Sequence, residues 1–110
     1  MHVVDTLVCM KKKEEPQWCW RIRGYDSLAQ IFDERISAGQ ITEGALKELL
    51  RALVAKDLSP HELIGAYAKR RTSISNGLLE IQRETQLEKK RTIYTCGNNP
   101  YYSAEIELCR

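Results

Sequence analysis

Apolar and polar residues alternate along two stretches of the chain, and this pattern predicts strands with one buried face. The first stretch runs from Gln17 to Arg23, and its apolar positions are Trp18, Trp20 and Ile22. The second runs over 102–108, and its apolar positions are Tyr102, Ala104, Ile106 and Leu108. Because successive side chains of a strand point to opposite faces, each stretch presents one apolar and one polar face.

Three further strands are predicted from residue types that favour extended backbone. Residues 2–11 form one, and a polar turn ending at Pro16 joins it to the strand over 17–23, which Gly24 closes. Residues 91–96 form another, followed by a turn over 97–100. Residues 78–85 are predicted as the third, because Leu79 and Ile81 fit a period of two. Good helix formers up to Arg91 keep a helix open for this segment.

The middle of the chain predicts three helices. The first is capped by Asp26 or Ser27 and ends at Gly39, with an apolar stripe at Leu28, Ile31, Phe32 and Ile36. The second is capped by Thr42, and its apolar face is Leu46, Leu49, Leu50, Leu53 and Val54. The third begins with a capping box over 59–62 and stops at Asn76-Gly77. Its apolar face is Leu63, Ile64, Tyr67 and Ile74.

This order of elements predicts the α+β class. An antiparallel sheet, built from an N-terminal hairpin and C-terminal strands, would pack against a three-helix middle segment in the order ββ-ααα-βββ. The chain has 110 residues, of which 43% are hydrophobic and 29% charged, and this fits a single domain over 1–110.

Location and redox state are predicted from absences in the sequence. Asp5 interrupts the N-terminal apolar run, and no stretch approaches the roughly 18 apolar residues of a membrane span, so a cytoplasmic protein is expected. The four cysteines are then expected as free thiols, although Cys9 and Cys19 would face each other across a hairpin and a bond between them stays open. Their spacing fits no common zinc motif, and no metal or cofactor is predicted.

Two aromatic pairs are the candidates for a ligand pocket between the sheet and the helices: Trp18, Trp20, Tyr67 and Tyr94. Tryptophans that share a strand face can stack on bases or on a planar ligand. They also pack well against helices, and the arginines fall on the opposite strand face, so the structural interpretation is favoured for Trp18 and Trp20.

Basic residues suggest a nucleic-acid surface as an alternative function. The candidates are Lys11, Lys12, Lys13, Arg21, Arg23, Lys69, Arg70 and Arg71. If the fold brought these clusters together, they would contact a phosphate backbone. Separately, the short connection over 56–59 between the second and third helices fits a helix-turn-helix, although an ordinary helical hairpin is favoured. The net charge is only +2, and acidic residues adjoin the clusters, so a solvated surface is favoured.

No group of residues points to catalysis. Glu105 and Glu107 share a strand face at a separation that suits two catalytic carboxylates, but exposed sheet faces commonly carry such charges. The sequence therefore favours a small non-enzymatic interaction protein that binds another macromolecule. Because the last strand is expected at a sheet edge, a homodimer is predicted with Tyr101, Tyr102 and Ile106 as interface candidates.

Overall fold

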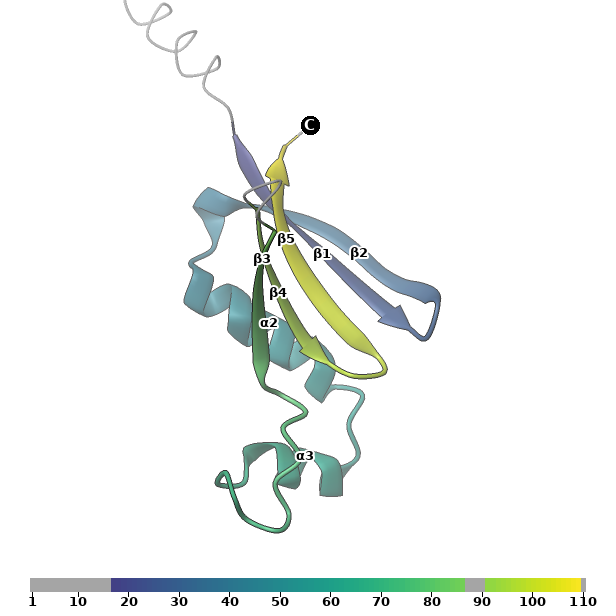
Figure 1. Ribbon diagram of the computed structural model, residues 1–110. Helices are drawn as coiled ribbons and strands as arrows, with labels where there is room; N and C mark the ends of the chain where they lie inside the picture. The colour runs from purple at the N-terminus through teal and green to yellow at the C-terminus, as the bar shows by residue number, and fades with distance from the viewer. Residues whose placement is uncertain (1–16, 87–90, 110) are drawn as a thin grey trace, which may run out of the picture.

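The computed structural model describes residues 17–86 and 91–109. It has five strands and two α-helices, with one 3-10 turn between β2 and α2 (Figure 1). In chain order the elements are β1 (Trp18–Asp26), β2 (Ala29–Ser37), η1 (Ala38–Gln40), α2 (Glu43–Ala55), α3 (Pro60–Tyr67), β3 (Ile81–Gln86), β4 (Arg91–Gly97) and β5 (Tyr101–Leu108).

The five strands form one antiparallel sheet in the order β2-β1-β5-β4-β3. The first and last strands therefore pair directly, with Ile22 opposite Ala104 and Trp20 opposite Ile106. Within the described residues, β2 and β3 are the two edges of the sheet. The predicted α+β class with an antiparallel sheet is confirmed.

Helix α2 covers one face of the sheet, and the core lies between them (Figure 1). The Thr42 hydroxyl caps this helix by accepting a hydrogen bond of 3.1 Å from the Ala45 N–H. Leu46, Leu50 and Val54 recur every four residues and are at most 2% exposed. They pack against strand residues of the same face: Trp20, Ile22, Tyr94, Cys96, Tyr102 and Ala104. The alternation of β1 and β5 predicts this buried face correctly.

The segment predicted as the first helix is strand β2. The apolar spacing there fits both kinds of element, because Phe32 and Ile36 lie on one face of a helix and also on one side of a strand. Formation of a hairpin with β1 selects the strand. Ser27 takes a positive φ of 57° in the turn, and β2 then pairs with β1, from Ala29 opposite Asp26 to Ser37 opposite Cys19. The middle segment thus holds two helices, and the three-helix prediction is wrong.

Helix α3 starts as predicted and ends earlier than predicted. The Ser59 hydroxyl accepts from the Glu62 N–H at 3.2 Å, and the Glu62 carboxylate accepts from the Ser59 N–H at 2.9 Å, so the capping box is confirmed. The helix stops at Tyr67, and turns, bends and irregular backbone occupy residues 68–80 up to β3. The Asn76 side chain donates to the Glu62 carbonyl at 2.9 Å and so holds this segment against α3.

The strands predicted over 91–96 and 102–108 are confirmed as β4 and β5, each one residue longer than predicted on the side of the turn that joins them. For the ambiguous segment, residues 81–86 form β3, whereas 78–80 precede it as a turn. The predicted strand over 2–11 and its turn lie outside the described residues. Neither described helix is long and apolar enough to cross a membrane.

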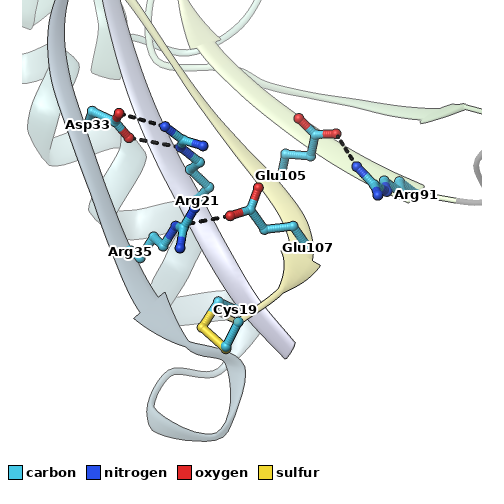
Figure 2. Close-up of polar contacts among 8 residues, drawn as sticks. Cys19, Arg21, Asp33, Arg35, Arg91, Glu105 and Glu107 are labelled. Carbon is cyan, nitrogen blue, oxygen red and sulfur yellow. Dashed lines mark hydrogen bonds and ion pairs between the residues drawn. A yellow bond between two sulfur atoms is a disulfide. The ribbon is translucent and has the colours of Figure 1, made fainter. Parts of the chain in front are cut away.

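A disulfide joins Cys19 in β1 to Cys109, which follows β5 (Figure 2). The two Cα atoms are 5.2 Å apart, because β1 and β5 are neighbours and Cys109 extends their pairing with a hydrogen bond to the Gln17 carbonyl. The expectation of free thiols is therefore wrong for these two residues, and Cys19 is not paired with Cys9. Cys96 is free and buried in the core, where burial raises the pKa of its thiol.

Candidate functional site

The sheet face opposite α2 carries a row of ion pairs between strands (Figure 2). Arg21 of β1 holds Asp33 of β2 through two hydrogen bonds of 3.0 and 2.8 Å. Arg35 of β2 reaches across to Glu107 of β5 at 3.0 Å, and Arg91 of β4 approaches Glu105 of β5 at 3.5 Å. The Arg21–Asp33 and Arg91–Glu105 contacts join diagonal positions of neighbouring strands on a shared face. The Arg35–Glu107 contact reaches across β1, which lies between β2 and β5.

The pair between Arg21 and Asp33 is joined by two hydrogen bonds. The hydrogen bond from Arg21 lowers the pKa of the Asp33 carboxyl, and the same bond raises the pKa of Arg21. Arg23 lies opposite Asp33 in the neighbouring row. Its Nε atom is buried and has no hydrogen-bond partner among the described residues. Asp33 therefore sits between two guanidinium groups, close to the sheet edge.

Strand β2 is the longer of the two edge strands of the described sheet. Asp33 and Arg35 of the charged row lie in this strand. Its register with β1 skips one residue, because Gly24 faces Phe32 whereas Tyr25 faces Gln30. Ile31 is the extra residue of this bulge. From Phe32 to Ser37 the strand is regular, with Phe32 and Ile36 half-buried and the three residues between them exposed. Within residues 17–86 and 91–109, no strand pairs with the outer side of this regular segment, so its backbone groups there are open to a partner.

Two adjoining grooves lie on the other face, between α2, β3 and the loop after α3. The first, of about 300 Å³, is lined by Lys47, Arg51, Arg70, Glu80, Ile81, Arg83 and Tyr94. The second, of about 230 Å³, is lined by Arg51, Ala66, Tyr67, Ala68, Arg70, Ser75, Gly77, Leu79 and Glu80. The Tyr94 hydroxyl donates to the Glu43 carboxylate at 2.6 Å, and this bond raises the pKa of Tyr94.

The four aromatic ligand candidates do not line a single pocket. Trp20 is 5% exposed and packs on Tyr94 with ring centroids 5.8 Å apart, so it belongs to the core. Trp18 lies at the start of β1 and is 46% exposed. Tyr94 and Tyr67 line the first and second groove respectively. The structure thus brings two of the four candidates to adjoining sites.

The basic candidates for nucleic-acid binding lie on different faces. Arg21 and Arg23 are on the face opposite α2, whereas Arg70 lines the grooves beside α2. Lys69 and Arg71 are exposed neighbours of Arg70 in the loop after α3. Lys11, Lys12 and Lys13 lie outside the described residues. Among the described candidates, the fold does not assemble the single basic surface that the hypothesis requires.

The last strand is not a sheet edge, because β5 pairs with β1 on one side and with β4 on the other. This corrects the reason for choosing the interface candidates. Tyr102 is 1% exposed and part of the core, while Tyr101 and Ile106 are half-buried. The Glu105 and Glu107 carboxylates, considered as a catalytic pair, each contact an arginine instead.

Sequence reasoning misses both the β2 edge and the grooves beside α2. The self-complementary run Phe32-Asp33-Glu34-Arg35-Ile36 is visible in the sequence, but its spacing also fits the predicted helix. In the part of the chain that the structure describes, no three His, Cys, Asp or Glu side chains cluster to hold a metal ion. Comparison with protein-family models, curated proteins and solved structures finds no match for this chain.

Proposed function

We propose that the protein is a homodimeric interaction protein whose two copies pair through their β2 strands. The self-complementary sequence of the regular β2 segment carries this proposal. Antiparallel pairing about a two-fold axis places residue 34+n of one copy opposite residue 34−n of the other when Glu34 lies on the axis. Two five-stranded sheets would then join into one.

Both side-chain faces of β2 match in this register. On the face opposite α2, Asp33 of one copy lies opposite Arg35 of the other, and the pair occurs twice. On the α2 face, Phe32 lies opposite Ile36, again twice. Opposite charges and aromatic–aliphatic pairs at directly facing positions each contribute about 0.2–1 kcal/mol. The dimer would also cover the exposed parts of Phe32 and Ile36, which already pack against the core.

The charged row on each open face positions the side chains that would pair between the two copies. Asp33 is held by Arg21 of its own copy, and Arg35 by Glu107 of its own copy. These side chains therefore lie along the open face before a partner arrives, which reduces the entropy lost when they pair. One contact opposes the dimer, because the two Glu34 carboxylates meet on the axis, and like charges directly opposite each other are unfavourable.

The proposed pairing of the two β2 strands ends where the bulge of β2 begins. The five facing positions run from Phe32 to Ile36 and stop short of the bulged Ile31. A bulge twists an edge strand and ends regular pairing. The interface would therefore be confined to the regular segment, which favours one register over slipped alternatives.

The substitution Arg35→Glu tests this interface. It places a second carboxylate opposite Asp33 at both ends, so we expect the dimer dissociation constant to rise by about tenfold or more. Sedimentation equilibrium over a micromolar concentration series measures the constant. A wild-type chain that sediments as a monomer throughout this range would overturn the proposal.

Arg91→Glu is the matched control, because it makes the same change on the same sheet face. Arg91 also loses one ion pair within its own chain, with Glu105, but it lies in β4, away from the β2 edge. We expect this variant to dimerise as the wild type does. Equal weakening by both substitutions would point to a general charge effect and contradict pairing through β2.

The disulfide bears on where the dimer would work. Disulfides persist mainly in oxidising compartments. The Cys19–Cys109 bond therefore favours an oxidising compartment. The cytoplasmic location stays a prediction from the sequence. That the dimer binds another macromolecule also stays a prediction.

A further inference from the structure

The grooves beside α2 gather four basic side chains from three separate parts of the chain. Lys47 and Arg51 come from α2, Arg70 from the loop after α3, and Arg83 from β3. Glu80 is the one carboxylate that lines the same groove. Since the chain as a whole has a net charge of only +2, this local excess of positive charge is a feature of the fold.

The basic groups differ in how far they are already neutralised. Arg51 is held by the Leu79 carbonyl at 3.1 Å and by the Glu48 carboxylate, so it is positioned and partly compensated. Arg70 is 84% exposed and only approaches Glu80, at 3.8 Å. Among the described residues, Lys47 and Arg83 have no carboxylate within ion-pair distance.

Tyr94 forms a fixed wall of the first groove. The Lys47 ammonium lies 5.1 Å from the centroid of the Tyr94 ring, which orients it by a cation–π contact. The Tyr94 hydroxyl is itself fixed by its bond to Glu43. Arg83 of β3 lies directly opposite Tyr94 in the pairing of β3 with β4, so the two side chains share one face of the sheet. Lys47 and Arg83 thus flank one aromatic side chain.

The second groove adds an aromatic surface. Tyr67 at the end of α3 lines it and is 70% exposed, next to Ala66 and Leu79. Arg51, Arg70 and Glu80 line both grooves, so the two grooves adjoin. An exposed tyrosine ring beside a basic groove offers a stacking surface for a planar ring.

We infer that this double groove binds a small phosphorylated ligand with a planar ring, of the nucleoside di- or triphosphate class. Guanidinium and ammonium groups are the side chains that bind phosphate oxygens with charge-assisted hydrogen bonds. The first groove would hold the phosphates between Lys47, Arg70 and Arg83, and the ring would lie against Tyr67. A volume of about 300 Å³ is at the lower end of small-molecule sites.

This site does not depend on the proposed dimer. The grooves lie along β3, and the proposed dimer forms through β2, at the other edge of the described sheet. A monomeric protein could bind the ligand equally well, and a dimer could form with the groove empty. The two proposals therefore fail or succeed separately.

Isothermal titration calorimetry with ADP and with tripolyphosphate tests the inference. We expect both to bind, with ADP losing affinity in Tyr67→Ala and tripolyphosphate binding unchanged by it. The double variant Lys47→Gln/Arg83→Gln should bind both about tenfold more weakly or worse, because it removes the two unpaired cations. Circular dichroism confirms that the variants fold.

Lys69→Gln/Arg71→Gln is the matched control, since it removes the same charge from residues that line neither groove. It should bind ADP as the wild type does. Absence of measurable heat with both probes, or equal loss in the two double variants, would overturn the inference. Binding of a DNA duplex but of neither small probe would also overturn it and favour a nucleic-acid surface.

Discussion

At position 24 of β1, a side chain has no room. A Cβ atom added there would collide with the ring of Tyr102, and it would lie 3.1 Å from the Cβ atom of Phe32. The sequence suggests that Gly24 closes the strand, but the glycine lies inside β1 and lets Tyr102 reach the core. Such a close approach depends on strand order and could not be inferred from spacing alone.

We therefore expect Gly24→Ala to lower the free energy of unfolding by about 1–3 kcal/mol, because the added methyl overpacks the core. Gly44→Ala is the control: it adds the same group in α2, where nothing lies within 4 Å. That change should stabilise the protein by up to about 1 kcal/mol through helix propensity. Urea unfolding measures both, and a neutral Gly24→Ala would contradict the packing described for Tyr102.

At the scale of elements, α3 depends on its cap because it has eight residues and buries little. The hydrogen bond from the Ser59 backbone lowers the pKa of Glu62. The stability from a lowered pKa is present above the ordinary glutamate range and is lost as pH falls through the lowered value. The capping box was predictable because its residues are local in sequence.

Ser59→Ala should destabilise α3 by about 1 kcal/mol, because the Glu62 N–H loses its acceptor. Hydrogen exchange at neutral pH should then be roughly fivefold faster for amides of α3, with α2 unaffected, since 1.4 kcal/mol corresponds to about tenfold. In the wild type, acidification through the lowered Glu62 pKa should release part of the same protection. Unchanged exchange in α3 would show that the cap does not hold this helix.

Strand β2 shows why element type was not fully predictable. Its apolar residues Ile31, Phe32 and Ile36 fit a helix by spacing, and Asp26 or Ser27 resembles a cap. Pairing with β1 outweighs this local preference, since tertiary context overrides weak propensities. The edge strand, and the self-complementary segment in it, could be identified only after that pairing was known.

At the scale of the whole molecule, the Cys19–Cys109 bond joins the first described strand to the last over a sequence separation of 90 residues. Removing it with Cys109→Ser should lower the free energy of unfolding by about 2–4 kcal/mol, since the unfolded chain regains freedom. Urea unfolding with and without reductant measures the loss. Reductant should not affect the variant, and a wild type insensitive to reduction would show that the bond contributes nothing.

The α+β class and most strands were predictable because they depend on local alternation. The strand order, the disulfide and both candidate sites were not, because each joins segments far apart in the chain. Arg70 and Arg83, for example, come together only because the turns between α3 and β3 return the chain to α2. The β5 strand was expected at an edge, and its central position moves the proposed interface to β2.

Charge exchange between two copies tests the central claim, that β2 strands pair about Glu34. Asp33→Lys alone sets a lysine against Arg35 of the other copy, and Arg35→Glu alone sets a glutamate against Asp33, so each variant should be a weak dimer. A mixture of the two variants restores both facing pairs, because the new lysine meets the new glutamate and the remaining Arg35 meets the remaining Asp33. Sedimentation velocity should therefore show dimers in the equimolar mixture at concentrations where each variant alone is monomeric. A mixture that stays monomeric while the wild type dimerises would contradict this interface.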